Sequence, residues 1–185
     1  MLLHFPIAVI GESEVEDALR EEPAWGLLSI RSAGREPIDI KVRGPRLDLT
    51  FDDIDHVPQG VWQHSPPCRV HADAIIRFAN QLRFEPAGMI VHCAAGISRS
   101  TAATIGIGAV LLGNPDAALK VLREATQLAE DRLWRMKGGV FPNIRLVGLF
   151  DHALSMRGDL VRKVLAAYPA RGGDVTAVLM DALNE

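Results

Sequence analysis

The chain has 185 residues, of which 48 % are hydrophobic and 23 % charged, as in an ordinary globular protein large enough for one substantial core. Its net charge of −3 disfavours a nucleic-acid-binding protein, because such surfaces are normally basic. No apolar run reaches the roughly 18 residues that cross a membrane, so neither nucleic acid nor membrane is expected as a partner. The N-terminus lacks the features of a signal peptide, and two cysteines are too few for a disulfide framework, so a cytoplasmic location is expected.

The first half of the chain alternates apolar runs with turn-forming segments, which predicts mainly strands. Strands are expected at residues 7–10, 25–30, 47–51 and 89–91. Ser13 and Glu16 have the spacing of a capping box and predict a helix that continues to about Arg20. Segment 31–44 is rich in glycine, proline and charge and predicts a loop that could hold a short strand at 38–42.

An acidic segment follows the strand at 47–51 and leads into a proline-rich loop at 57–67. After that loop the chain is mostly helical, apart from the strand at 89–91. Helices are expected at residues 70–84, 98–112, 114–129, 142–156, 161–167 and 175–183. Asn114 and Asn143 stand where the third and fourth of these helices begin.

Strands in the first half and helices in the second predict an α/β fold, with a central mixed, mostly parallel sheet flanked by helices. The length indicates a single domain over residues 1–185. In sheets of this kind ligands bind outside the carboxyl ends of the strands. The residues that follow the strand at 89–91 are therefore the first place to look for a site.

These residues, His92 to Ser100, read HCAAGISRS and place a thiol before a loop and a guanidinium after it. The loop between Cys93 and Arg99 can curl so that its backbone amides face inward and bind a cluster of anionic oxygens. The amides belong to Ala94, Ala95, Gly96, Ile97, Ser98 and Arg99. The Arg99 side chain can hold two phosphate oxygens, and the same field favours a Cys93 thiolate that attacks phosphorus.

The other polar residues near the loop have supporting roles. The Ser100 hydroxyl can donate to the Cys93 sulfur and ease its departure from an intermediate. His92 is expected to hold the loop through hydrogen bonds to the backbone rather than to react. Cys68 is expected to be a bystander, with a resolving partner for Cys93 as the alternative, and Cys93 itself could be an inert buried thiol. The histidines form no ligand cluster, so no metal and no other cofactor is expected.

The pattern His-Cys-x-x-Gly-x-x-Arg-Ser resembles the signature loop of the cysteine-dependent protein tyrosine phosphatase superfamily. His92, Cys93, Gly96, Arg99 and Ser100 carry the match. It is most similar to the small dual-specificity branch, in its bacterial form. The resemblance implies a dual-specificity-phosphatase-like fold and hydrolysis through a cysteinyl-phosphate intermediate.

The resemblance extends to the strand at 25–30 and to Asn143, which matches an asparagine that this branch places at a helix start behind the signature loop. It covers about residues 5–155 and leaves a helical extension at residues 159–185. No role can be assigned to that extension from the sequence.

The resemblance also implies a general acid, an aspartate on a separate loop upstream of the cysteine. Asp53 is the preferred candidate, because it is the aspartate of a Phe-x-Asp-Ile pattern that resembles one in related bacterial members. Asp55 is the second candidate and Asp52 the third. Asp53 stands forty residues before Cys93, a longer gap than small dual-specificity enzymes usually have. The proline-rich insert at 57–67 could account for the difference.

The expected function is phosphomonoester hydrolysis, with a phosphorylated protein or a small phosphomonoester as substrate. No aromatic recognition loop of the phosphotyrosine-specific enzymes is visible, so a shallow pocket could also accept phosphoserine or phosphothreonine. Ala94, Ala95 and Ile97 are uncharged, which disfavours phosphoinositides. The alternatives are a catalytically silent phosphoprotein-binding module and a sulfurtransferase or arsenate reductase. The sequence does not indicate an oligomeric state.

Overall fold

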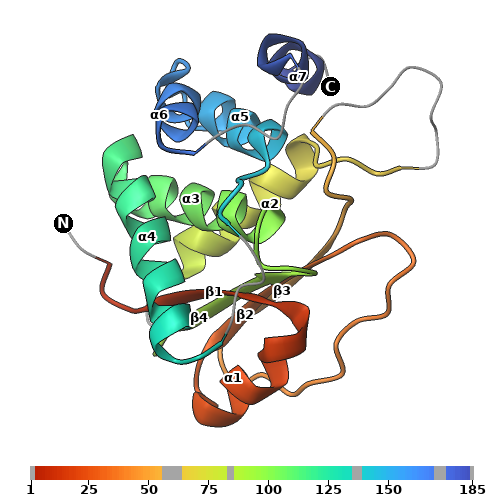
Figure 1. Ribbon diagram of the computed structural model, residues 1–185, viewed down its shortest axis with the longest axis vertical. Helices are drawn as coiled ribbons and strands as arrows, with labels where there is room; N and C mark the ends of the chain where they lie inside the picture. The colour runs from red at the N-terminus through yellow and green to blue at the C-terminus, as the bar shows by residue number, and fades with distance from the viewer. Residues whose placement is uncertain (1–2, 56–63, 83–85, 135–138, 169–173, 184–185) are drawn as a thin grey trace.

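The computed structural model describes residues 3–55, 64–82, 86–134, 139–168 and 174–183. A sheet of four strands lies across its middle (Figure 1). The strands are β1 (Ile7–Gly11), β2 (Gly26–Arg31), β3 (Arg46–Thr50) and β4 (Met89–Cys93), in the order β1-β4-β2-β3. All pairings between these four are parallel, so the described sheet is more uniform than the mixed sheet that we expected.

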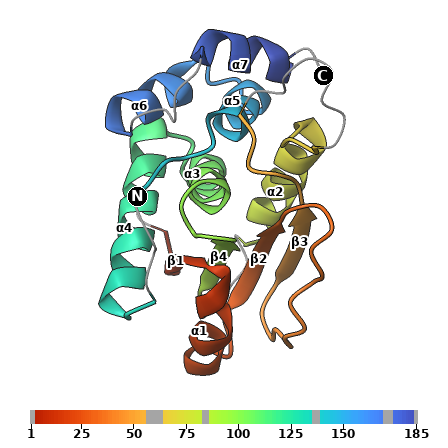
Figure 2. The same ribbon diagram turned by 45° about the vertical axis from the view of Figure 1, so that its right-hand side comes forward.

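Helices cover both faces of the sheet. A short 3-10 turn, η1 (Glu12–Glu14), and α1 (Val15–Glu21) lie on one face, and most helices lie on the other (Figures 1 and 2). The latter are α2 (Arg69–Gln81), α3 (Arg99–Leu112), α4 (Pro115–Asp131), α5 (Ile144–Ala153), α6 (Asp159–Ala167) and α7 (Val175–Leu183). The fold is therefore the α/β layer arrangement that the sequence predicts.

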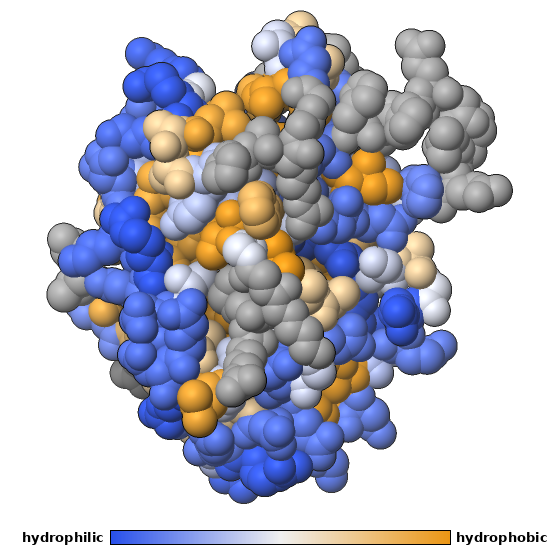
Figure 3. Space-filling view, viewed as in Figure 1, coloured by the Kyte–Doolittle hydropathy of each residue, from blue (hydrophilic) through white to orange (hydrophobic). Residues whose placement is uncertain are grey.

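Two apolar clusters fill the spaces on either side of the sheet. The larger one joins Val91 of β4 to α3, α4 and α5, and it also includes Val178 and Ala182 of α7. The smaller one joins Ile90 of β4 to α1. In Figure 3 the outer surface over α1 and α4 is mostly hydrophilic, as expected for helices that bury only one side.

Helix α3 is buried along almost its whole length, which agrees with the central position that its apolar sequence predicts. Gly106 allows α5 to approach it closely: a Cβ at this position would lie only 2.3 Å from Cε2 of Phe150. The starts of the two helices also lie side by side, since the Asn143 amide donates to the Ser98 carbonyl at 3.3 Å. The two helix N-termini that carry Arg99 and Asn143 therefore meet at one end of the sheet.

Most predicted elements are confirmed to within a few residues. Asn114 begins α4 as predicted, since its Oδ1 accepts hydrogen bonds from the amides of Asp116 at 2.8 Å and Ala117 at 3.1 Å. The segment at 38–42 forms no strand. Residues 57–63 of the proline-rich loop and the end of the predicted 70–84 helix lie outside the described residues.

The predicted capping box at Ser13 is wrong. The first turn of this segment is a 3-10 turn, so Ser13 lies inside it rather than ahead of the α-helix. Its hydroxyl donates to Oε1 of Glu14 at 2.7 Å, and no side chain caps α1. None of the described helices is both long and apolar enough to span a membrane.

Candidate active site

The loop at residues 94–98 leaves β4 at Cys93 and enters α3 at Arg99. Gly96 makes its bend possible, because its φ of +74° suits glycine and a Cβ there would lie 2.6 Å from the carbonyl carbon of Ile10. The Glu12 amide donates to the Ala94 carbonyl at 3.2 Å and ties the start of the loop to η1, which directly follows β1. The backbone of β1 therefore fixes the curvature of the loop.

The carbonyl groups at the end of the loop accept hydrogen bonds from residues that follow it in the chain. The carbonyl of Ile97 accepts from the Phe141 amide at 3.1 Å and from Oγ1 of Thr101 at 2.8 Å, and Thr101 also donates to the Ser98 carbonyl at 2.7 Å. The amides of residues 94–97 donate to none of the residues that the structure describes. A loop with occupied carbonyls and available amides at a helix N-terminus suits an anion.

Cys93 is buried, with 2 % of its surface exposed, and its Sγ lies 3.2 Å from Oγ of Ser100. Burial alone would raise the pKa of the thiol. The Ser100 hydroxyl and amide, the positive charge of Arg99 and the Ser98 amide outweigh burial and lower the pKa below its ordinary value. The site therefore shifts the equilibrium of the Cys93 thiol toward the thiolate.

His92 is fully buried next to this thiol. Burial lowers the pKa of the His92 imidazole to about 4, against a smaller opposing effect of the Cys93 backbone, so the ring is neutral at physiological pH. Neither ring nitrogen has a hydrogen-bond partner among the described residues. The hydrogen bonds that we expected His92 to make to the loop backbone stay a prediction, which the opposing interaction with the Cys93 backbone supports.

The Arg99 guanidinium is anchored on one side only. Its Nη1 donates to the Phe51 carbonyl at 2.8 Å and to Oγ of Ser32 at 3.0 Å. Its Nε is buried and has no partner among the residues that the structure describes. Nη1 thus fixes the group, while Nε and Nη2 on the other edge donate to none of the described residues, and two donors on one edge are the geometry required to bind two oxygens of one anion.

Of the three aspartates after β3, Asp53 contacts the loop. Its Oδ1 accepts from Oγ of Ser98 at 2.6 Å and from Nδ2 of Asn143 at 3.1 Å. Asn143 also caps α5, since its own Oδ1 accepts from the Leu146 amide at 2.9 Å. Its backbone amide donates to the Ser98 carbonyl at 3.3 Å. Asn143 therefore joins Asp53, the end of the loop and the start of α5.

Asp52 and Asp55 have other contacts. Asp52 accepts from the amides of Ser65 at 3.0 Å and Ala33 at 3.4 Å. Burial opposes the charged form of Asp52, but these hydrogen bonds outweigh it and lower the pKa of the carboxyl. Oδ1 of Asp55 accepts from the amides of Ile144 at 2.9 Å and Arg145 at 3.4 Å, which places a negative charge at the N-terminus of α5.

Our sequence reasoning missed Ser32 and the Phe51 carbonyl as partners of Arg99, and Thr101 as a support of the loop. Ser32 and Phe51 directly follow β2 and β3, at the same sheet edge at which Cys93 ends β4. Their position at the ends of two strands could have indicated that Ser32 and Phe51 lie near Cys93, because parallel strands bring their carboxyl ends together. A backbone carbonyl, by contrast, has no sequence signature.

Cys68 and Cys93 are both free. Cys68 caps α2: its Sγ lies 3.2 Å from Nδ1 of His71, and its amide donates to the same nitrogen at 3.0 Å. These contacts give Cys68 a structural role. In the described part of the chain, no group of three or more histidine, cysteine or acidic residues is arranged to hold a metal ion.

The fold is similar to solved phosphatase structures. The crystal structure of PTPMT1 in complex with PI(5)P matches with a TM-score of 0.52 and 12 % identity, over 83 % of this chain and 94 % of that one. The crystal structure of DUSP15 matches with a TM-score of 0.52 and 18 % identity, over 90 % and 92 %. No family model and no curated protein matches the sequence. The chain therefore has the dual-specificity-like fold of the cysteine-based phosphatases.

Replacing Ser100 with alanine should raise the pKa of Cys93, because the variant loses a hydrogen bond to the thiolate. Such a bond to a charged group contributes about 1.5–3 kcal/mol, which corresponds to a shift of about 1–2 pH units. The ultraviolet absorbance of the thiolate as a function of pH measures it, in a Cys68→Ser background that leaves one thiol. Thr104→Ala is the matched control, since Thr104 donates to the Ser100 carbonyl and not to Cys93. An unchanged midpoint in Ser100→Ala would contradict the assigned contact.

Proposed function

We propose that this protein is a phosphomonoester hydrolase of the protein-tyrosine-phosphatase type that acts through a cysteinyl-phosphate intermediate. The observation that carries the proposal is the half-anchored Arg99, buried and with Nε available, at the end of a loop that begins with a buried thiol of lowered pKa. A phosphate dianion supplies the oxygens that such a loop lacks.

In the first step the Cys93 thiolate attacks phosphorus and forms the S–P bond while the P–O bond to the leaving group breaks. The loop amides and Arg99 hold the phosphoryl oxygens and stabilise the charge that develops on them. Asp53, as the general acid, gives its proton to the departing oxygen. Its contact with Ser98 at 2.6 Å supports this role, because it keeps the carboxyl beside the loop.

In the second step a water molecule attacks phosphorus, and the Asp53 carboxylate takes the proton that the water loses. The S–P bond breaks, and inorganic phosphate leaves. Ser100 donates a hydrogen bond to the Cys93 sulfur and stabilises the thiolate as it departs, which the 3.2 Å contact supports. Asp55 and Asn143 position the acid segment and the start of α5, and take no part in bond making.

We propose phosphotyrosine proteins as substrates, with phosphoserine and phosphothreonine accepted as well. Ala94 and Ala95 are exposed and uncharged, so the rim of the site offers no cationic side chain for a second phosphate from these two positions. That favours a monophosphorylated protein over a polyphosphorylated inositol lipid. From the sequence pattern alone, we also propose that the protein belongs to a bacterial branch of this superfamily and that it is cytoplasmic.

The first test is hydrolysis of para-nitrophenyl phosphate by the purified full chain. We expect the wild type to turn it over and Cys93→Ser to have no activity above background, because the hydroxyl of serine is not ionised by the same field. Equal turnover by the two proteins would overturn the enzyme assignment. Tight binding of a phosphopeptide without turnover would indicate a phosphoprotein-binding module, and persulfide transfer from thiosulfate would indicate a sulfurtransferase.

The second test concerns the acid. Asp53→Asn should lower the turnover of phenyl phosphate, a poor leaving group, by about 100-fold or more, since general acid catalysis contributes roughly that much. It should lower para-nitrophenyl phosphate turnover far less, because that leaving group departs without a proton. Asp116→Asn is the matched control, because Asp116 lies on α4 and pairs with Lys163, whereas Asp55 positions the acid segment. If Asp55→Asn shows this selectivity and Asp53→Asn does not, the acid is Asp55.

A further inference from the structure

The first turn of α5 contacts the chain on both sides of the segment that follows Asp55. On one side, Oδ1 of Asp55 accepts from the amides of Ile144 and Arg145. On the other side, Nε of Arg145 donates to the Pro67 carbonyl at 2.9 Å, just before α2. Asp53 stands two residues before Asp55. Its neighbour Asp52 exchanges hydrogen bonds with Ser65, two residues before Pro67, so α5 supports the position of Asp53 from both sides.

Arg145 itself is fully buried, which is rare for a charged side chain. A buried guanidinium needs an opposite charge and good hydrogen bonds to offset the loss of water. Asp181 of α7 provides that charge, with Oδ2 at 2.6 Å from Nη1 of Arg145. The carboxylate is 40 % exposed, so α7 reaches the buried cation from the surface of the molecule.

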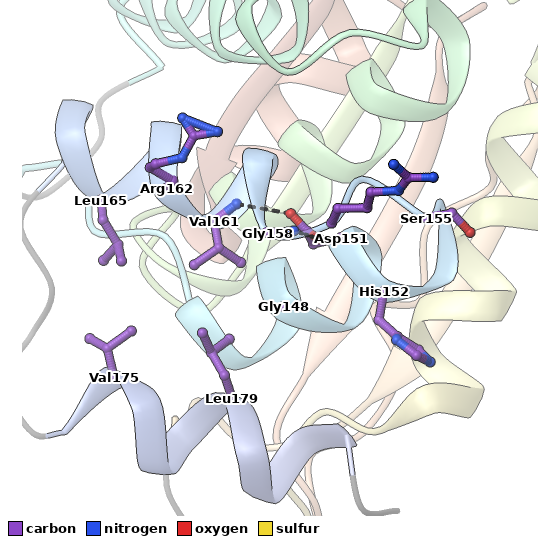
Figure 4. Close-up of a pocket in the computed structure, with 11 residues that line it drawn as sticks. Gly148, Asp151, His152, Ser155, Gly158, Val161, Arg162, Leu165, Val175 and Leu179 are labelled. Atoms are coloured by element: carbon purple, nitrogen blue, oxygen red, sulfur yellow. Dashed lines mark hydrogen bonds between the residues drawn. The ribbon is translucent and has the colours of Figure 1, made fainter.

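Apolar packing of α7 against the rest of the protein is incomplete. Leu179 lies close to α5, where a Cβ on Gly148 would be 2.4 Å from its Cδ2. A cavity of about 740 Å³ nevertheless lies between α5, α6 and α7. Figure 4 shows Val175 and Leu179 of α7 facing Val161 and Leu165 of α6 across it. A specific polar contact is therefore important for fixing α7 on α5.

We propose that Asp181 is a positioning residue for proton transfer by Asp53, and that α7 is thereby a working part of the active site. Asp181 holds the Arg145 guanidinium, Arg145 holds the Pro67 carbonyl, and the same turn of α5 holds Asp55. The inference rests on the proposed phosphatase function. It gives the C-terminal extension a role, that of fixing the segment that carries the acid.

Loss of the Asp181 charge affects this segment more than the loop at residues 94–98. Without the ion pair the Arg145 side chain is drawn toward water, and its bond to Pro67 weakens. The residues that hold the phosphate share the contact from Asn143 to the Ser98 carbonyl with α5, but they have further anchors of their own in the Glu12 amide, Thr101 and the Phe51 carbonyl. The rate of the proton-transfer step should therefore fall, while the affinity for phosphate stays unchanged.

The test is Asp181→Asn in the full chain. We expect turnover of phenyl phosphate to fall about tenfold, part of the 100-fold or more that the acid contributes. Turnover of para-nitrophenyl phosphate and inhibition by inorganic phosphate should change little, and Asp181→Glu should restore activity toward phenyl phosphate. Asp116→Asn is the control, because it removes another ion pair between two helices, 2.6 Å from Nζ of Lys163. An equal loss for both substrates, or no loss, would overturn the proposal.

Hydrogen–deuterium exchange gives a second readout that does not depend on catalysis. Asp181→Asn should speed exchange of amides at residues 52–55, 64 and 65 and in the first turn of α5, with no change at residues 93–99, whereas Asp116→Asn should leave these segments unchanged. If the wild type hydrolyses no aryl phosphate, the proposed function fails, and faster exchange then still establishes the coupling from α7. Unchanged exchange would show that Asp181 does not position this segment.

Discussion

The site depends on the placement of the Arg99 guanidinium at the end of a parallel sheet. A buried cation must find acceptors, and the fold offers two of them where strands end: the Phe51 carbonyl after β3 and the Ser32 hydroxyl after β2. These two contacts satisfy Nη1 and fix the plane of the group. The other edge stays available for an anion, so the binding geometry exists before any ligand arrives.

The rest of the site is organised around the same sheet edge. Strand β4 delivers Cys93 there, and α3 directs its N-terminus at the loop that separates the thiol from Arg99. Helix α5 brings a second N-terminus, where Asn143 contacts both the loop backbone and Asp53. Gly106 permits this approach because any side chain on it would strike Phe150. The absence of a side chain at Gly106 thus lets α3 and α5 pack closely behind the site.

The sequence was a good guide wherever one short segment contained all the necessary groups. The thiol, the bend glycine and the arginine stand within seven residues, and the asparagine caps of α4 and α5 are local as well. Asp53 was chosen from a family pattern, and it is the acidic residue whose carboxylate contacts Ser98. The α/β layer fold and the site at the carboxyl end of a central strand followed from strands in the first half and helices in the second, but the strand order was not predicted.

Contacts made by the backbone or across long sequence separations could not be predicted in this way. The Phe51 carbonyl carries no side-chain signal, and the Arg145–Asp181 pair joins residues that are 36 positions apart in two helices. The capping box at Ser13 failed because the chain turns there as a 3-10 segment, a choice that tertiary packing decides. Local patterns thus located the groups to which we assign the reaction, while tertiary contacts determine how those groups are held.

The most direct test of this account is to trap the covalent intermediate. Rapid acid quenching of the wild type during turnover of an aryl phosphate, followed by peptide mass spectrometry, should find one phosphoryl group on Cys93. A phosphoryl group on another residue, or none during demonstrated turnover, would contradict the central claim that the Cys93 thiolate is the nucleophile of a phosphatase.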